Sequence, residues 1–128
     1  MLIPKKIFQT FETTQLPEGM SKACLSWKIK NPDWQYYFFD KNDRVEFIKK
    51  HFTKDVLEAY LTLIPGAFKA DLWRYCVLYT EGGVYIDADT ICELPLNDWV
   101  LSDNHFIATR DDPMAHKWLG NAFIATVP

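Results

Sequence analysis

The chain has 128 residues, a length that fits one compact domain and is too short for two. Apolar residues make up 48% of the chain and aromatic residues 16%, which argues against a disordered protein and favours a globular one with a substantial core. The net charge is −3 and no long basic run is present, so nucleic acid is not an expected partner.

The cysteines and the opening residues indicate the cellular compartment in which the protein is expected. Cys24, Cys76 and Cys92 lack C-x-x-C spacing, and two of them lie in apolar segments, so we expect buried, reduced thiols. The opening residues MLIPKKIFQT lack the apolar run of a signal peptide, and no window approaches the ~18 apolar residues of a membrane span. We therefore expect a cytoplasmic protein without a transmembrane segment.

The first half of the chain alternates between predicted strands and helices. Pro32 ends the first of these helices, because proline disfavours helix for the residue before it. Asp40 or Asn42 is the expected cap of the second helix. In chain order, the pattern predicts a strand at 6–11, a helix at 17–30, a strand at 34–40, a helix that reaches residue 52 and a helix at 54–63.

The second half begins with a strong helix over residues 67–80. Its expected apolar stripe, at helical spacing, consists of Phe68, Leu72, Tyr75, Cys76 and Tyr79. The helix is expected to end at Gly82 and Gly83, because glycine readily takes the left-handed conformation that closes a helix.

The remaining predicted elements are strands. The run VYIDAD predicts a strand over 84–89, and weaker strands are expected at 91–92, 106–109 and 122–126. Asp111 and Asp112 are expected in a solvated turn. The alternation predicts a single α/β sheet packed between helices, in which ligands bind at the carboxyl ends of strands.

Asp87 and Asp89 end the predicted strand one residue apart. Because side chains alternate on a strand, Tyr85, Asp87 and Asp89 are expected to share a face. Two close carboxylates favour a hard cation such as Mg²⁺ or Mn²⁺, which keeps positions open for diphosphate oxygens. The alternative is an ordinary turn whose aspartates bond backbone amides.

Asp71 and Arg74 are neighbours on one face of the preceding helix, because they are three residues apart. An exposed helical ion pair is one interpretation. The other follows from the short return into the strand, which brings this helix near the carboxylates. There, Arg74 would meet a phosphate oxygen or a sugar hydroxyl.

The run AFKADLWRYCVLYTEGGVYIDAD resembles glycosyltransferase family 32, the DXD-containing sugar transferases that include α-mannosyltransferases and capsular polysaccharide transferases. The opening IPKKIFQTFET resembles the first strand of that family, and GNAFIAT resembles a later segment. The elements of the central run that match the family pattern are Ala70, Asp71, Arg74, Leu78, Gly82, Gly83, Tyr85, Asp87 and Asp89.

The resemblance implies a GT-A-type, Rossmann-like α/β fold and a role in polysaccharide biosynthesis. The implied activity is metal-dependent, retaining transfer of a sugar from a UDP- or GDP-sugar to a glycan or other hydroxyl acceptor. Mn²⁺ or Mg²⁺ is the implied cofactor, held by Asp89 with the assistance of Asp87, and the catalytic residues would be Asp87, Asp89 and Arg74. The implied donor-binding residues are Asp71, Arg74, Tyr85, Asp87, Gln9, Thr10 and Asn121. For Gln9 and Thr10, an ordinary strand end is the competing interpretation.

The family pattern continues beyond Pro128, so residues 1–128 are expected to form one donor-binding and catalytic domain without the C-terminal acceptor-binding part. A partner chain or the missing part would then complete the protein. A noncatalytic sugar-nucleotide-binding domain is an alternative. A haloacid dehalogenase-type phosphatase is a remote one, since VYIDADTI resembles its nucleophile strand but stands late in the chain.

Overall fold

The structure, a computed structural model of the chain, describes residues 1–110 and 118–128. Asp111 and Asp112 lie outside the described residues. The helices and strands, in chain order, are β1 (Lys6–Thr10), α1 (Glu18–Lys30), β2 (Gln35–Phe39), α2 (Lys41–His51), α3 (Lys54–Thr62), α4 (Gly66–Glu81), β3 (Gly83–Ile86), the short 3-10 helix η1 (Leu96–Asp98), β4 (Phe106–Arg110) and β5 (Leu119–Thr126).

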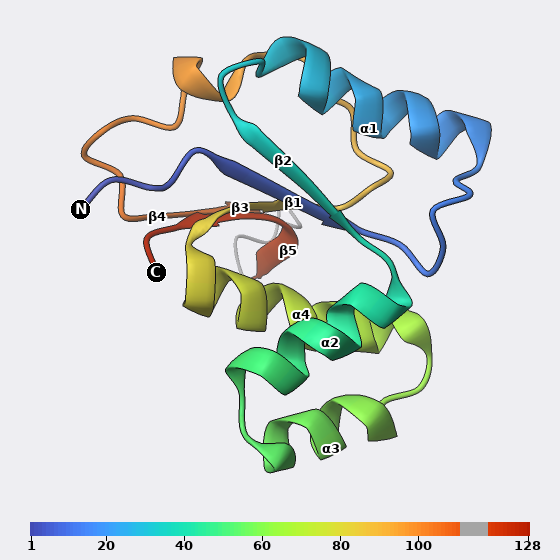
Figure 1. The fold of residues 1–128 in the computed structure, drawn as a ribbon. Helices are drawn as coiled ribbons and strands as arrows, with labels where there is room; N and C mark the ends of the chain where they lie inside the picture. Colours follow the sequence, from blue (N-terminus) through green and yellow to red (C-terminus); the bar gives the residue numbers. More distant parts are fainter. Residues whose placement is uncertain (111–117) are drawn as a thin grey trace.

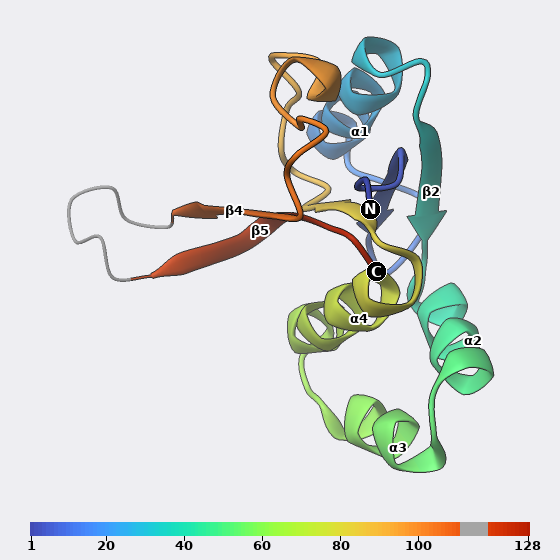
Figure 2. The ribbon, with the colours of Figure 1, turned by 90° about the vertical axis from the view of Figure 1, so that its left-hand side faces the viewer.

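The strands form one mixed five-stranded sheet in the order β2-β1-β3-β5-β4. Strands β1, β2 and β3 are parallel, whereas β5 runs antiparallel to both β3 and β4. Helix α1 covers one face, and α2, α3 and α4 lie on the other (Figure 1). Strands β4 and β5 extend away from the helical layers as a hairpin (Figure 2). The expected α/β class is confirmed.

The core follows from side-chain alternation along the central strands. Ile7, Val84 and Phe123 face α1, where they pack with Trp27 and other buried residues. Their strand neighbours Phe8, Tyr85 and Ile124 face the opposite layer, where they pack with α4. The sheet therefore separates two apolar clusters, and a one-residue shift in register would exchange the two sets.

A pair of glycines turns the chain from α4 into β3. Gly82 has φ +62° and Gly83 has φ +98°, a region that other residues rarely adopt. A Cβ on Gly83 would also lie 2.7 Å from the carbonyl oxygen of Lys6 on the neighbouring strand. The predicted role of the glycines is confirmed, and they allow β3 to begin directly after the helix.

Several sequence predictions are corrected. Residues 91–92 form no strand, and β3 ends at Ile86, which places both aspartates of the D-x-D after the strand. The predicted stripe of α4 is wrong at Phe68, Tyr75 and Tyr79, which are exposed. The face of α4 that is buried consists of Trp73, Arg74, Cys76, Val77 and Leu78. The three cysteines are buried and free, as expected.

Candidate functional site

A polar cleft lies at the carboxyl ends of β1 and β3. Its volume is about 360 Å³. It runs across three adjacent strands, because β1 and β5 flank β3 in the sheet. The described residues that line it are Thr10, Phe11, Glu12, Met20, Arg44, Gly66, Ala67, Ala70, Asp71, Arg74, Tyr85, Asp87, Ala88, Asp89 and Asn121. This cleft brings together most of the predicted site residues.

Asp87 is held in a defined position at the end of β3. Its backbone N–H donates to the carbonyl of Ala122 at 2.8 Å, and its own carbonyl accepts from the Thr90 backbone N–H at 3.2 Å. The hydroxyl of Tyr85 donates to Asp87 Oδ1 at 2.7 Å, so these two side chains share a face as predicted. Asp89 lies in the turn that follows, exposed and on the same cleft.

Arg74 connects the helix, the D-x-D turn and the hairpin. Its guanidinium is almost fully buried, with Nη2 at 2.8 Å from Asp71 Oδ1 and at 3.6 Å from Asp87 Oδ1. Nη1 donates to the backbone carbonyl of Asn121, and the guanidinium carbon lies 4.3 Å from the centre of the Tyr85 ring. The arrangement is therefore not the exposed helical ion pair that the sequence left open.

The electrostatics of Asp87 favour binding of a cation. Burial raises the pKa of its carboxyl above the usual range, and the nearby charges of Asp89 and Asp71 raise it further. The hydrogen bond from Tyr85 and the charge of Arg74 act in the opposite direction without cancelling the effect. A carboxylate in such surroundings gains from a cation that neutralises the repulsion.

The donor set fits a divalent ion that also binds substrate. Within residues 1–110 and 118–128, no group of three or more His, Cys, Asp or Glu side chains is arranged to hold a metal. Asp87 and Asp89 therefore supply two carboxylates at most. Mg²⁺ is commonly bound by one or two carboxylates together with water and phosphate oxygens, and a diphosphate would complete such a shell.

Thr10 and Gln9, the two predicted donor-binding residues of β1, differ in their position relative to the cleft. Thr10 lines the cleft, and its hydroxyl donates to the carbonyl of Phe39 at 2.6 Å. Gln9 is fully buried and is not on the cleft wall, so the expectation of a direct nucleotide contact is not met. Instead, its amide donates to the carbonyl of Asp87 at 3.2 Å and its oxygen accepts from Tyr36 at 2.7 Å. Gln9 thus supports the turn from behind.

Asn121 enters the cleft from β5. Its side-chain amide lies 3.5 Å from Asp71 Oδ1, at the outer limit of a hydrogen bond. Because Arg74 also binds the Asn121 carbonyl, strand β5 and helix α4 are fixed to each other at this point. The structure thus brings Asn121, Asp71 and Arg74 together.

Sequence reasoning missed Glu12 and Arg44. Arg44 is a fully buried cation of α2, and its Nη2 pairs with a carboxylate oxygen of Glu12 on the cleft wall. Asp40 signalled the start of α2 correctly, with a capping box formed with Asp43. The pairing itself joins residues 32 positions apart, so no local spacing could reveal it.

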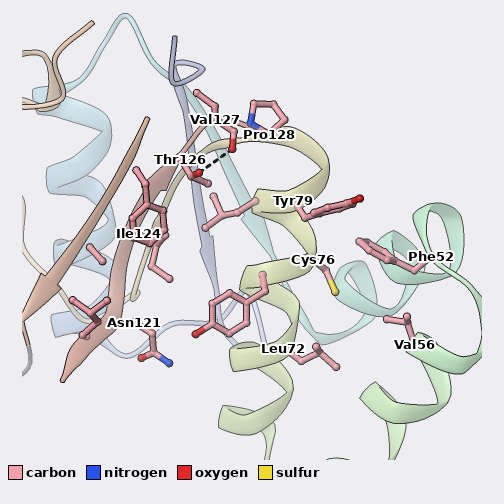
Figure 3. A pocket seen from close by; sticks show the side chains of 16 residues that line it. Phe52, Val56, Leu72, Cys76, Tyr79, Asn121, Ile124, Thr126, Val127 and Pro128 are labelled. Atoms are coloured by element: carbon pink, nitrogen blue, oxygen red, sulfur yellow. Dashed lines mark hydrogen bonds between the residues drawn. The ribbon is translucent and has the colours of Figure 1, made fainter. Parts of the chain in front are cut away.

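A second, larger hollow lies on the flank of α4 that faces β5. Figure 3 shows it between the exposed side of α4 and the hairpin, with Leu72, Cys76 and Tyr79 on one wall and Ile124 and Thr126 on the other. It has a volume of about 710 Å³ and a mainly apolar lining. Asn121 borders both hollows, but none of the described residues that line this one has a carboxylate side chain, so they do not reproduce the chemistry of the cleft.

None of the helices in the described part of the chain combines the length and the apolar character that crossing a membrane would require.

The chain is similar to known mannosyltransferases. The initiation-specific alpha-1,6-mannosyltransferase of Candida albicans is 32% identical over 114 residues, which cover 84% of this chain and 30% of that protein. Inositol phosphoceramide mannosyltransferase 1 of Schizosaccharomyces pombe is 30% identical, with 98% of this chain and 39% of that protein covered. The chain thus spans well under half of the length of these relatives.

A solved structure and a protein family that match this chain are both glycosyltransferases. A solved structure, the PaToxG glycosyltransferase, superposes with a TM-score of 0.74 over 98% of this chain and 55% of that one, at 21% identity, which supports a small GT-A-like fold. Residues 17–106 match the family described as the glycosyltransferase sugar-binding region containing the DXD motif. The chain therefore belongs to this family of DXD-containing glycosyltransferases, family 32.

Proposed function

We propose that the chain is the donor-binding and catalytic domain of a metal-dependent, retaining glycosyltransferase. It moves a sugar from a nucleotide-diphospho-sugar to a hydroxyl of a glycan or other acceptor. The observation that carries this proposal is the buried Arg74, which joins Asp71 and Asp87 on one cleft. The names of the relatives make mannose the donor sugar to test first.

The charge of the cleft explains why a divalent ion is part of the proposal. Four of the residues that line it are acidic and two are arginines, which leaves an excess of two negative charges. A diphosphate would be repelled there without a cation. Mn²⁺ or Mg²⁺, held by Asp89 with Asp87, would act as a Lewis acid that stabilises the negative charge on the departing nucleoside diphosphate.

The side chains around the D-x-D turn would orient the donor. Asp71 accepts hydrogen bonds from sugar hydroxyls, and Arg74 keeps that carboxylate in place while its charge favours the diphosphate. Tyr85 fixes the rotamer of Asp87 through its hydroxyl. The acceptor hydroxyl then attacks from the face that the diphosphate leaves and gives its proton to the departing phosphate.

Calorimetry with UDP- and GDP-sugars, with and without Mn²⁺, tests the proposal. We expect binding that depends on the metal, followed by release of the free nucleoside diphosphate when an acceptor is added. Asp89→Ala should abolish the metal-dependent part of binding, whereas Asp103→Ala, a change at an exposed aspartate that does not line the cleft, should not. If Asp89→Ala binds metal and nucleotide as the wild type does, the proposal is wrong.

A noncatalytic donor-binding domain is the second candidate. Metal-dependent binding of a nucleotide-sugar without any release of nucleoside diphosphate, at every acceptor tried, would support this candidate over the transferase.

A further inference from the structure

The polar cleft has two ends, which the sheet order distinguishes. The D-x-D turn follows the central strand β3, Asn121 lies on β5 to one side, and Thr10 and Glu12 follow β1 on the other side. Adjacent strands are about 4.8 Å apart, so these are separate positions along the cleft. If the diphosphate lies at the turn and the sugar lies at Asp71 and Asn121, the end beside β1 is left for the nucleoside.

Glu12 presents a carboxylate at this β1 end. It is held by Arg44, a side chain with only 1% exposure, which also donates through Nε to the Tyr60 hydroxyl at 2.8 Å and through Nη1 to the Thr10 hydroxyl at 2.7 Å. Burial alone would lower the pKa of Arg44, but the hydrogen bonds with Tyr60 and Glu12 raise it overall, so the guanidinium stays charged. Arg44 is therefore held by contacts with Tyr60 and Thr10, and it fixes the Glu12 carboxylate in turn.

Helix α4 leaves room for this carboxylate by beginning with glycine. A Cβ at Gly66 would lie 2.6 Å from Glu12 Oε1 and 3.1 Å from Oε2. Gly66 precedes Asp71 by five residues, about 7.5 Å along the helix axis, so the Glu12 end is distinct from the sugar end. About half of the Glu12 side chain remains exposed, which leaves it accessible to a ligand.

We propose that Glu12 selects the base of the donor and favours guanine over uracil, with Arg44 as its positioning residue. The proposal rests on the donor-binding function proposed above. An ionised carboxylate only accepts hydrogen bonds, and its two oxygens offer about four acceptor positions, of which Arg44 uses one. The Watson–Crick edge of guanine presents two adjacent donors, N1–H and the N2 amino group, which match a carboxylate.

Uracil offers a poorer match to the same group. Its single donor, N3–H, stands between two carbonyl oxygens, and both oxygens would repel a carboxylate that approaches N3–H. Base contacts by side chains typically discriminate by factors of about five to 150. We therefore expect Mn²⁺-dependent binding of guanosine diphosphate that is about tenfold or more tighter than that of uridine diphosphate.

The test measures the affinity of the whole chain for three nucleotides by calorimetry in the presence of Mn²⁺. The probes are guanosine, inosine and uridine diphosphate, because inosine keeps N1–H but lacks the N2 amino group. The wild type should bind the guanosine form several-fold more tightly than the inosine form. Glu12→Gln should lose most of this preference, because the amide places one donor opposite the two donors of guanine.

Glu58→Gln is the matched control, since Glu58 is an exposed carboxylate of α3 that does not line the cleft. It should leave all three affinities unchanged. Arg44→Lys should lower the base preference without changing the affinity for Mn²⁺ alone, because Arg44 is not in contact with Asp87 or Asp89. Thermal unfolding of each variant shows whether it is folded.

Two results would overturn the proposal. If Glu12→Gln weakens the guanosine, inosine and uridine forms equally, Glu12 contacts the ribose and does not select the base. If the wild type binds the three nucleotides equally, Glu12 contributes no selectivity. By contrast, the absence of Mn²⁺-dependent binding of any nucleotide would contradict the donor-binding function itself, which keeps the two failures distinguishable.

Discussion

At the residue scale, the sequence motif identified the centre of the cleft but not its boundaries. Asp71 and Arg74 lie in a helix, and Asp87 and Asp89 follow directly after the next strand, so their spacing predicted their proximity. The contact between Glu12 and Arg44 depends on how α2 packs beside β1, and local patterns do not encode that packing. Gln9 shows the converse error, because a polar residue at a strand end can point into the protein and satisfy the backbone.

Replacement of Arg74 by lysine should separate positioning from charge. The guanidinium contacts two carboxylates and a backbone carbonyl at once, and an ammonium group cannot reproduce that fork. We expect sugar transfer, or metal-dependent donor binding, to fall by about 100-fold. Kinetics or calorimetry would show this, with Lys54→Met, an exposed change on α3, as the control. An unchanged rate in Arg74→Lys would mean that charge alone is sufficient.

Asp87→Asn should stabilise the metal-free protein. Because burial raises the pKa of Asp87, folding favours its protonated form, and the stability of the metal-free chain falls as pH rises from the ordinary carboxyl pKa through the raised one. Above that window, the neutral amide removes the cost, so the melting temperature near pH 7 should rise slightly. Scanning calorimetry at pH 4 and pH 7 checks both the sign and the pH window.

Mn²⁺ gives the complementary measurement for Asp87. The ion should raise the melting temperature of the wild type, because a ligand that binds only the native state stabilises it. It should have little effect on Asp87→Asn, which lacks one of the two carboxylates. A variant that is less stable than the wild type without metal at pH 7 would contradict this account of Asp87.

At the scale of elements, hydrophobic periodicity located the helices well and misjudged which side of α4 is buried. The stripe of Phe68, Tyr75 and Tyr79 has the right spacing, yet α4 packs on the sheet through Trp73 and Val77. The error has a physical cause. Tyrosine tolerates exposure because its hydroxyl meets water, and the flank of α4 toward β5 is left open by the diverging hairpin (Figure 3).

Alanine should change the free energy of unfolding in opposite directions at two glycines, Gly83 in the turn between α4 and β3 and Gly19 in α1. Gly83→Ala should lower the free energy of unfolding by ~1–3 kcal/mol, because the position combines φ +98° with a close approach to the Lys6 carbonyl. Gly19→Ala in α1 has open space and should raise that free energy by about 0.5–1 kcal/mol. Urea denaturation measures both, and equal effects would show that the turn geometry is not limiting.

At the scale of the whole molecule, strand and helix alternation was sufficient to predict an α/β sheet, and the resemblance supplied its GT-A-like character. The position of the hairpin was less predictable. Its strands were expected to be weak and short, whereas β5 runs from Leu119 to Thr126 and carries Asn121 into the cleft. Long-range pairing determines this extension, since β5 gains its partners from β3, more than 30 residues earlier.

The apolar hollow beside α4 predicts a measurable surface property. Uncovered apolar surface of this kind binds hydrophobic dyes, and Tyr79, which is 76% exposed, stands at its rim. Tyr79→Lys should therefore reduce dye fluorescence without lowering the melting temperature. Ile64→Lys, an equally exposed change outside the hollow, should not. Equal losses in the two variants would show that the dye binds elsewhere.

The glycine pair has a practical consequence for work with this protein. Gly82 lies against Pro128 and Gly83 against Lys6, the first residue of β1, and both ends of the chain lie on this side of the sheet (Figure 1). That side is at the amino end of β3, whereas the D-x-D turn is at its carboxyl end. A purification tag or a surface linkage attached at either end would therefore leave the mouth of the cleft open.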